Sequence, residues 1–302
     1  MKHISIITVN YNQPLATEEL LNSILEKNSG DLPEVIVVDN GSKEDHTTSW
    51  KTAYPDFIFI RSEKNLGFAG GNNLGIKHSK GKYLFLINND TVVTGNLMPT
   101  LSKFLDENPD YAIVCPKIRY YDEPDILQYA GFTKMNFYTA RNKCVGQFET
   151  DKGQYDSVPK LTHYPHGAAM MLRKDLVDKV GLMPENYFLY YEEMDWCEMF
   201  KRAGYKCGLC MEVVIFHKES LSTGKNSVLK DFYMNRNRLL FVRRNAAPAQ
   251  LAIFFLYFIT ILNTRYSINC LRNGEAARIA TFYKALYWNL THKAYSPISE
   301  KF

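Results

Sequence analysis

Three carboxylates lie within four residues at Glu192-Glu193-Met194-Asp195, and aromatic residues flank them on both sides. Partial burial among aromatic rings raises the pKa of a carboxylic acid toward neutrality, where its ionised form can accept a proton from a substrate hydroxyl. Acidic residues also stabilise the start of a helix through the helix dipole. The cluster therefore indicates either a general base or a helix N-terminus.

A further carboxylate, Asp90, follows the apolar run Leu84–Ile87 and the two amides Asn88 and Asn89. The apolar run predicts a buried strand, and ligands bind outside the carboxyl ends of strands in open α/β sheets. A carboxylate there can bind a divalent cation or lie beside a phosphate, although Asn and Asp are also common turn residues. Asp90 is thus a candidate metal ligand, and a simple turn is the alternative.

Three more polar stretches are predicted to reach the same edge of the sheet. They are Thr8-Val9-Asn10, Asp39-Asn40-Gly41-Ser42 and the Gly-rich stretch from Asn65 to Gly75. A Gly-rich turn that enters a helix lets backbone N–H groups approach a diphosphate. It is not the dinucleotide fingerprint, which lies on the first strand–helix turn, nor a P-loop, because no Gly-Lys-Ser/Thr follows. An oxidoreductase on a dinucleotide-binding sheet is therefore disfavoured.

The elements that must position these groups alternate along the first 115 residues. The predicted strands are Ile4–Val9, Glu34–Asp39, Phe57–Ile60, Lys82–Ile87 and Tyr111–Cys115. The helical patterns between them are Leu15–Glu26, Asn72–His78 and Leu97–Glu107. This alternation predicts an α/β fold with a mostly parallel central sheet and helices on both faces.

The pattern breaks between about residues 117 and 164, where Gly, Pro and aromatic residues predict a long irregular excursion. Such loops in enzymes often bind substrate. The alternation resumes with a strand at Ala168–Arg173, a helix at Glu192–Ala203 and a strand that closes on Phe216-His217. A single histidine at a strand end is more often structural than a metal ligand.

The composition is that of an ordinary folded protein, with 46% hydrophobic and 23% charged residues. Met1-Lys2-His3 leads into a strand pattern rather than a signal peptide, so we expect a cytoplasmic protein with six free cysteines. Cys207 and Cys210 do not predict a zinc site, because a three-residue offset in a strand points their sulfurs to opposite faces.

The C-terminal region differs from the rest in charge. Residues 225–302 carry 12 Lys/Arg and three Asp/Glu, whereas the first 224 residues carry 24 and 29. Leu251–Leu262 is almost wholly apolar but shorter than the roughly 20 residues that a transmembrane helix needs. A basic, apolar, helical region predicts contact with an anionic membrane surface, and a buried helix or a homodimer contact is the alternative. No nucleic-acid-binding motif is recognised there.

The motifs, in their order, resemble those of the family 2 glycosyltransferases, and more narrowly a bacterial rhamnosyltransferase-like branch. They are VDNGS, NLGFAGGNNLGI, LINNDTVV and GAAMMLRKDLVDKVGLMPENYFLYYEEMDWCEMFKRAGY, followed by Phe216-His217 and Asn235–Arg238. The resemblance implies a GT-A fold at residues 1–227, with a nucleotide-sugar-binding half at 1–115 and an acceptor-binding and catalytic-base half at 116–227. Residues 228–302 are the helical C-terminal extension.

The resemblance also implies a role for each candidate residue. Asp90 is the expected ligand of Mg²⁺ or Mn²⁺, His217 completes the metal site, and Asn88 stands where many members have an acidic residue. Glu193 matches the catalytic base, and Glu192 and Asp195 are alternatives because the usual residue is an aspartate. The expected nucleotide-sugar-binding residues are Thr8, Asn10, Asp39, Asn65, Gly67, Gly70, Gly71, Asn73, Asn88 and Asn89.

The implied function is inverting transfer of a sugar, with rhamnose as one candidate, from a nucleotide diphosphate to a saccharide or lipid-linked saccharide acceptor. Such a reaction belongs to cell-surface polysaccharide biosynthesis, and the basic C-terminal region would fit a place at the inner face of the cell membrane. Asn88 and Glu193 leave open an alternative, a catalytically silent nucleotide-sugar-binding protein.

Overall fold

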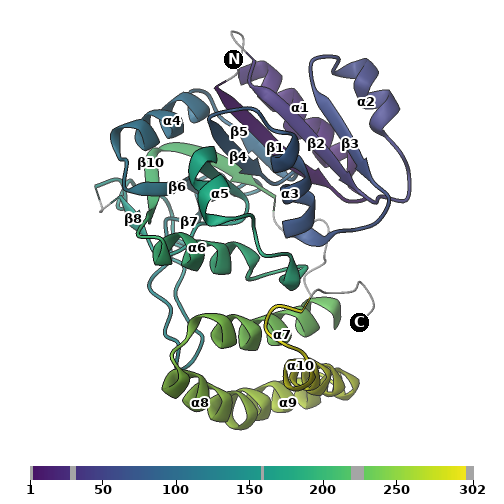
Figure 1. The fold of residues 1–302 in the computed structure, drawn as a ribbon, viewed down its shortest axis with the longest axis vertical. Helices are drawn as coiled ribbons and strands as arrows, with labels where there is room; N and C mark the ends of the chain where they lie inside the picture. Colours follow the sequence, from purple (N-terminus) through teal and green to yellow (C-terminus); the bar gives the residue numbers. More distant parts are fainter. Residues whose placement is uncertain (1–2, 28–31, 158–159, 219–227, 297–302) are drawn as a thin grey trace.

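The computed structural model describes residues 3–27, 32–157, 160–218 and 228–296. Figure 1 shows a body built on a central sheet and, beneath it, a layer of helices. The layer is formed by the helices that follow residue 227, and all strands of the described residues lie in the body.

The central sheet has the strand order β3-β2-β1-β4-β9-β6-β10-β5, with β7 paired to β6 and β8 paired to β10. The strands are β1 (Ile4–Asn10), β2 (Glu34–Asn40), β3 (Ile58–Ser62), β4 (Tyr83–Ile87), β5 (Thr91–Val93), β6 (Tyr111–Tyr120), β7 (Leu127–Tyr129), β8 (Leu161–Thr162), β9 (Ala169–Arg173) and β10 (Lys206–His217). Strands β3, β2, β1 and β4 are parallel, as the sequence predicts. Beyond them the sheet is mixed, because β9 is antiparallel to both β4 and β6.

Helices cover both faces of this sheet and form the layer below it (Figure 1). They are α1 (Pro14–Lys27), α2 (Thr47–Ala53), α3 (Gly67–His78), α4 (Leu97–Glu107), α5 (Lys174–Val180), α6 (Glu192–Arg202), α7 (Val228–Asn245), α8 (Pro248–Tyr257), α9 (Asn263–Arg272) and α10 (Ile279–Thr291). The short helical turns are η1 (Glu185–Tyr187), η2 (Phe258–Leu262) and η3 (Ala276–Arg278). Helix α3 begins earlier than the predicted Asn72, because its glycines pack closely against β1.

A continuous apolar core fixes the strands that carry the polar groups. Every residue of β2 and β4 is buried, as expected for parallel strands that helices cover on both faces. Burial of one Val, Ile or Leu side chain contributes roughly 1.5–3 kcal/mol, so burial specifies the register strongly. That register pairs Asn10 with Asp39 and Ile7 with Leu86, which brings the ends of β1, β2 and β4 to one edge.

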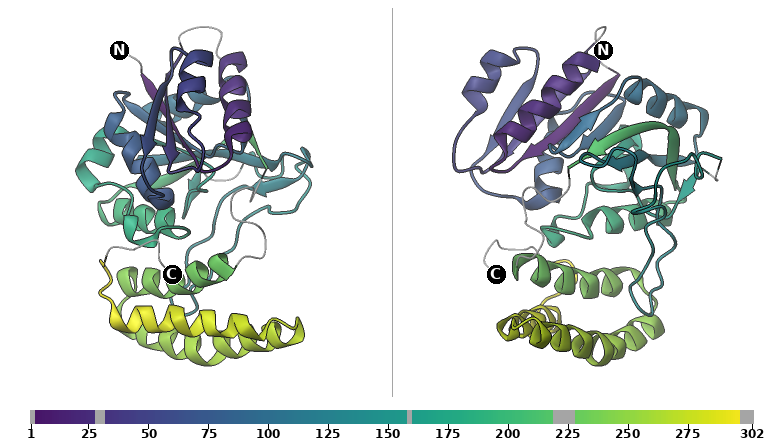
Figure 2. Two further views of the ribbon diagram at one scale, coloured as in Figure 1. Left: turned by 90° about the vertical axis from the view of Figure 1, so that its right-hand side faces the viewer. Right: turned by 180° about the vertical axis from the view of Figure 1, so that it is seen from behind.

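The excursion contains more regular structure than its sequence indicates. Strand β6 continues to Tyr120 and pairs with β7. A long hairpin with bridges between Phe132 and Cys144 and between Asn136 and Arg141 reaches down to the helical layer (Figure 2). There the ring of Phe137 stacks on Phe241 with centroids 5.8 Å apart. The hairpin therefore connects the body to α7.

Helices α8 and α9 are joined through η2 into one helix, Pro248–Arg272. The helix has 25 residues, and its most apolar window of 18 residues has a mean hydropathy of 1.5. By length and composition it can cross a membrane, and 17% of that window is buried. The apolar run Leu251–Leu262 alone predicted a shorter segment. The helix is longer because Ile268 and Leu271 extend its apolar stripe beyond Asn263.

Candidate active site

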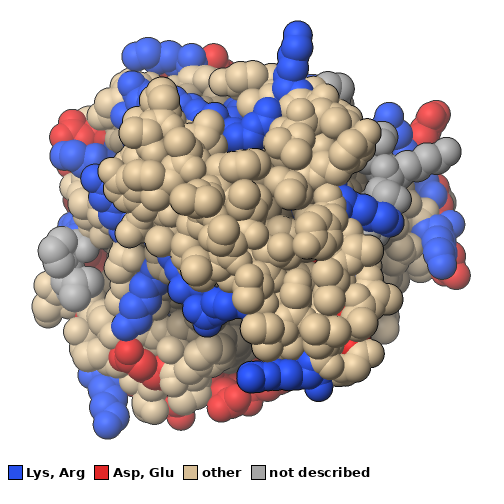
Figure 3. All heavy atoms as spheres, turned by 90° about the horizontal axis from the view of Figure 1, so that it is seen from below, with Lys and Arg blue, Asp and Glu red and all other residues tan. Residues whose placement is uncertain are grey.

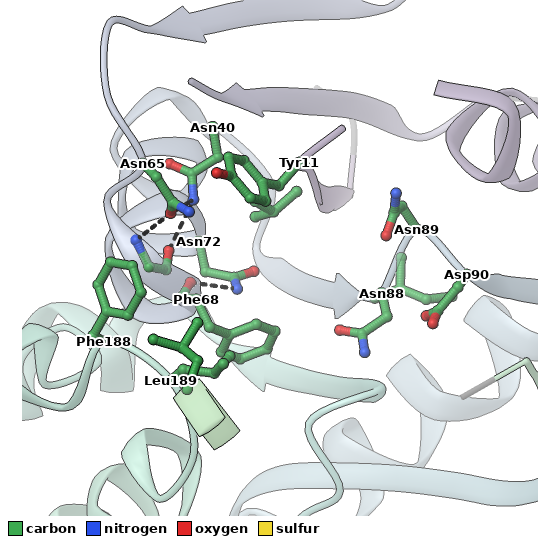
Figure 4. Close-up of a pocket in the computed structure, with 14 residues that line it drawn as sticks. Tyr11, Asn40, Asn65, Phe68, Asn72, Asn88, Asn89, Asp90, Phe188 and Leu189 are labelled. Atoms are coloured by element: carbon green, nitrogen blue, oxygen red, sulfur yellow. Dashed lines mark hydrogen bonds between the residues drawn. The ribbon is translucent and has the colours of Figure 1, made fainter. Parts of the chain in front are cut away.

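The polar ends of β1, β2 and β4 meet the start of α3 at one edge of the sheet, around a cavity of about 240 Å³ (Figure 4). Its lining includes Tyr11, Asn40, Asn65, Gly67, Phe68, Asn72, Asn88, Asn89 and Asp90. The structure thus brings together the strand ends and the Gly-rich segment that the sequence indicates.

Asn40 at the end of β2 fixes the Gly-rich segment. Its side chain accepts a hydrogen bond from the Leu66 N–H at 3.0 Å and donates one to the Gly67 carbonyl at 3.0 Å. Gly67 has a φ of +73°, and a Cβ there would lie 2.3 Å from the Phe188 carbonyl oxygen, so a side chain is not tolerated. The Phe68 N–H donates to the same Phe188 carbonyl at 2.8 Å. The loop before α6 therefore rests on the start of α3.

Gly70, Gly71 and Asn73 do not line this cavity. A Cβ at Gly71 would lie 2.8 Å from the Val9 side chain, so this glycine permits α3 to pack closely on β1. Asn73 donates to the Met183 carbonyl at 2.8 Å and so connects α3 to the segment after α5. A contact of these three residues with a donor stays a prediction.

Thr8, Asn10 and Asp39 are buried and also lie outside the cavity lining. The Asp39 carboxylate accepts hydrogen bonds from Asn10 at 3.2 Å and from Arg61 at 2.7 Å. The Thr8 hydroxyl has no hydrogen-bond partner among the described residues. The network holds the ends of β1, β2 and β3 together, and a contact of Asp39 with a nucleobase stays a prediction.

Asp90 and His217 lie side by side, both largely buried. Nε2 of His217 is 3.1 Å from Oδ1 of Asp90, and Nδ1 is 2.8 Å from Oε1 of Gln128. When Nδ1–H donates to Gln128, the lone pair of Nε2 faces a carboxylate oxygen that accepts no hydrogen bond from the described residues. Two donor atoms at this separation fit neighbouring ligands of Mg²⁺ or Mn²⁺, because octahedral ligands about 2.1 Å from an ion lie about 3 Å apart.

This pair does not enclose a cation by itself. In the part of the chain that the structure describes, no group of three or more His, Cys, Asp or Glu side chains could hold a metal ion. Mg²⁺ in phosphate-binding enzymes is commonly held by one or two side chains together with phosphate oxygens and water. Asp90 and His217 therefore fit a cation that is bound jointly with a diphosphate.

Glu192 and Glu193 share a second cavity, of about 330 Å³, with Asp90 and His217. Burial raises the pKa of Glu193 to about 7. Burial, together with the neighbouring Glu193 charge, raises the pKa of Glu192 well above its ordinary value. Because both burial and the Glu193 charge oppose ionisation of Glu192, Glu193 is the better proton acceptor of the pair.

Residues 5–181 match the model of a protein family described as glycosyl transferase family 2. The chain belongs to this family. The low-salt glycan biosynthesis hexosyltransferase Agl10 of Haloferax volcanii is 26% identical over 248 residues, which cover 78% of this chain and 74% of that protein. The dTDP-rhamnosyl transferase RfbF of Shigella flexneri is 24% identical over 275 residues, 87% of each chain. The family predicted from the motifs is confirmed.

Solved glycosyltransferase structures share the fold of this family 2 member. The mannosyltransferase PcManGT from Pyrobaculum calidifontis, in complex with GDP-Man and Mn²⁺, is similar with a TM-score of 0.57 at 17% identity, over 96% of this chain and 87% of that one. The predicted GT-A fold with a helical C-terminal region is confirmed.

In this glycosyltransferase Asp195 is separated from the other two acidic candidates. It is fully buried and accepts hydrogen bonds from Arg244 at 2.6 Å and Asn245 at 2.5 Å. Its two partners on α7 hold the Asp195 carboxylate, whereas Glu192 and Glu193 line the cavity. Asp195 joins α6 to α7.

His166, which was not among the candidate site residues, also lines the cavity of the glutamates. Burial, with a smaller contribution from His217, lowers the pKa of His166 to about 3, so its ring is neutral. Its position is fixed by the Phe132 ring, which is parallel to it with centroids 6.3 Å apart. The sequence indicated the segment around His166 only as part of the excursion that shapes the pocket.

Proposed function

We propose that the protein catalyses inverting transfer of a sugar from a nucleotide diphosphate to a saccharide or lipid-linked saccharide acceptor. The observation that carries this proposal is the shared cavity, in which Glu193 faces the same space as Asp90 and His217. A proton acceptor and a diphosphate-binding pair are the two groups that such a displacement needs. This arrangement favours catalysis over a silent nucleotide-sugar-binding protein.

The chain's own groups perform distinct parts of the reaction. Glu193 accepts the proton of the acceptor hydroxyl as its oxygen attacks the anomeric carbon from the side opposite the leaving diphosphate, which inverts the configuration. Asp90 and His217 would hold Mg²⁺ or Mn²⁺, whose charge stabilises the departing diphosphate. Neutral His166 and Phe68 line the same cavity and limit the access of water.

The names of two similar proteins support the donor class: RfbF is a dTDP-rhamnosyl transferase, and PcManGT is a mannosyltransferase in complex with GDP-Man. We expect a nucleotide sugar, with rhamnose as the first candidate. A thermal-shift screen of nucleoside diphosphates and nucleotide sugars with Mn²⁺ tests this, followed by release of the nucleoside diphosphate. Stabilisation without any turnover, in the presence of saccharide acceptors, would instead support the silent binding protein.

Asp90→Ala is expected to remove the metal-dependent part of donor binding. The variant keeps His217 but loses the carboxylate, and the donor Kd with Mn²⁺ should rise at least about tenfold, toward the value measured with EDTA. Isothermal titration with and without Mn²⁺ measures both values. Asp56→Ala is the control, because it removes a carboxylate that is exposed and distant from Asp90 in the sequence. Equal metal dependence in Asp90→Ala and the wild type would contradict the assignment.

The acceptor class is suggested by the outer face of the helical layer. Figure 3 shows that face as a broad uncharged area with Lys and Arg side chains mainly toward its edges. The exposed apolar and tyrosine residues of α8, η2, α9 and α10 are Ile253, Leu256, Ile261, Ile268, Leu271, Tyr283, Tyr287 and Leu290. Arg265 and Arg272 are exposed on the same helices. Apolar and tyrosine side chains bordered by basic ones suit the interface of an anionic membrane, at the cytoplasmic side where a lipid-linked acceptor would be presented.

Membrane contact predicts that the protein sediments with vesicles of phosphatidylglycerol and phosphatidylcholine but less with phosphatidylcholine alone. The double substitution Leu256→Asp and Leu271→Asp should abolish sedimentation, because it places two charged groups where apolar side chains would enter the membrane. Leu15→Asp on α1, at a position 79% exposed, should have no effect. The alternative is a homodimer interface. It would be supported if the protein does not bind vesicles but forms a dimer in solution that the double substitution dissociates.

A further inference from the structure

A third cavity, of about 290 Å³, adjoins the proposed active site. It is lined by Tyr120, Tyr121, Asp122, Glu123, Ile126, Phe148, His217 and Lys218. His217 also lines the cavity of the glutamates, so the two cavities share this residue in their walls. Nothing in the reaction described above uses the aromatic and acidic residues of this third cavity.

Phe148 has the features of a binding residue rather than a packing residue. Its side chain is 71% exposed, although its backbone φ of +66° is strained for a residue with a side chain. The position is nevertheless well defined, because the Phe148 N–H donates to the Leu127 carbonyl at 2.9 Å and the ring stacks on Tyr120 at 5.6 Å with planes 8° apart. The pair presents fixed aromatic surface at the cavity, and such surface packs well against the C–H face of a sugar ring.

Two carboxylates complete the cavity. Asp122 and Glu123 are exposed in the turn between β6 and β7, and neither side chain forms an ion pair or hydrogen bond with a described residue. Their oxygens can accept hydrogen bonds from hydroxyl groups. Lys218 also lines the cavity, but its ammonium group is paired with Glu19. The two carboxylates therefore leave the lining net negative and disfavour a phosphate or another anion, so the ligand that fits is neutral and rich in hydroxyls.

The cavity is held at a fixed position relative to the Asp90–His217 pair. Tyr120 is paired with His217 in the parallel ladder of β6 and β10, and the Tyr121 N–H donates to the His217 carbonyl at 3.1 Å. These backbone contacts fix the distance between the third cavity and the cavity of the glutamates, because His217 lines both.

We propose that this third cavity binds a neutral saccharide unit of the acceptor that does not react, with Phe148 and Tyr120 as an aromatic platform and Asp122 and Glu123 as hydrogen-bond acceptors. The inference rests on the proposed transferase function and extends it by a second acceptor subsite. The cavity would then favour acceptors longer than one sugar.

Saturation-transfer NMR on the full-length protein tests the subsite with methyl α-L-rhamnopyranoside and methyl β-D-glucopyranoside, and inorganic phosphate serves as the anionic probe. We expect at least one glycoside to bind and phosphate not to compete. Phe148→Ala should weaken glycoside binding by roughly tenfold, the loss expected when one ring face is removed, whereas Phe148→Tyr should keep it. Tyr138→Ala, which removes a side chain 46% exposed in the long hairpin, is the matched control and should bind like the wild type.

The proposal is overturned if the wild type binds neither glycoside, if phosphate competes, or if Phe148→Ala and Tyr138→Ala bind equally. Donor binding with Mn²⁺ is measured on the same preparations and reports separately on the transferase function. Loss of glycoside binding with intact donor binding in Phe148→Ala supports the subsite. If the wild type binds a glycoside but no donor, the proposal of a saccharide subsite stands and the proposed transferase function is rejected.

Discussion

Glu193→Gln is expected to lower the rate of sugar transfer by roughly 10³-fold, within the range for loss of a general base, while the donor Kd stays unchanged. The amide has nearly the same shape as the carboxylate but cannot accept the proton of the acceptor hydroxyl. Donor contacts remain, because Glu193 lines the cavity of about 330 Å³ and not the one beside the Gly-rich segment. Release of the nucleoside diphosphate and donor titration measure the two effects.

The pH profile gives this prediction a second measurement. Because burial raises the pKa of Glu193 to about 7, the ionised fraction and therefore kcat should rise as pH increases through 7 and then level off. Glu192→Gln is the matched comparison. We expect the Glu192→Gln variant to lose less activity, since burial and the Glu193 charge raise the pKa of Glu192 and disfavour its ionised form. If Glu193→Gln retains turnover while Glu192→Gln does not, the base is Glu192.

Asn237→Leu is expected to impair catalysis although Asn237 is fully buried in α7 and lines none of the three cavities. The loop before Glu192 holds Phe188, Tyr190 and Tyr191 at φ values of +68°, +70° and +77°. Each such residue costs about 1–3 kcal/mol unless its surroundings enforce the conformation. The loop therefore depends on contacts from outside itself.

Asn237 supplies those contacts. Its side-chain amide donates to the carbonyls of Tyr187, Leu189 and Tyr190 at 3.1, 2.6 and 2.8 Å. Leucine has a similar volume but no donor, so the three carbonyls would lose the hydrogen bonds of this amide, and the free energy of unfolding should fall by about 2–4 kcal/mol. A shift of the loop would also displace Glu193, and a displacement of about 1 Å can cost roughly 10²-fold in kcat.

Asn235→Leu is the matched control for this prediction. Asn235 lies in the same helix and is nearly as buried, but among the described residues its side chain donates only to the Asp231 carbonyl of its own helix. We expect it to keep kcat and to lose less stability. The kcat of Asn237→Leu is to be measured well below its melting temperature, with the donor Kd as a second readout. An unchanged kcat together with a lowered melting temperature would reduce Asn237 to a purely structural role.

Local sequence patterns determined the parallel half of the fold. Runs such as Glu34–Asp39 and Lys82–Ile87 are too apolar and β-branched to be anything but buried strands, and the polar residues that follow them must reach the edge of the sheet. The order of the motifs was sufficient for the family. The strand that precedes Asp90 indicated that this carboxylate reaches the edge of the sheet, and the resemblance to the family gave it the expected role of metal ligand.

Contacts between distant segments decided the rest. The sequence alone does not distinguish Asp195 from Glu193 as a candidate base. In the structure, Arg244 and Asn245 of α7 bind Asp195, whereas Glu193 lines the cavity. The strained loop before α6 likewise depends on contacts from distant segments, Phe68 on α3 and Asn237 on α7.

The physical reason is the range of the forces involved. Hydrophobic periodicity acts within one element and is readable from neighbouring residues, so strands and helices could be predicted. The direction of a side chain at a helix start, and the pKa that results from its burial, depend on partners that only the folded chain brings near. The sequence therefore determined which residues could do chemistry, and the tertiary structure decided which of them share a cavity.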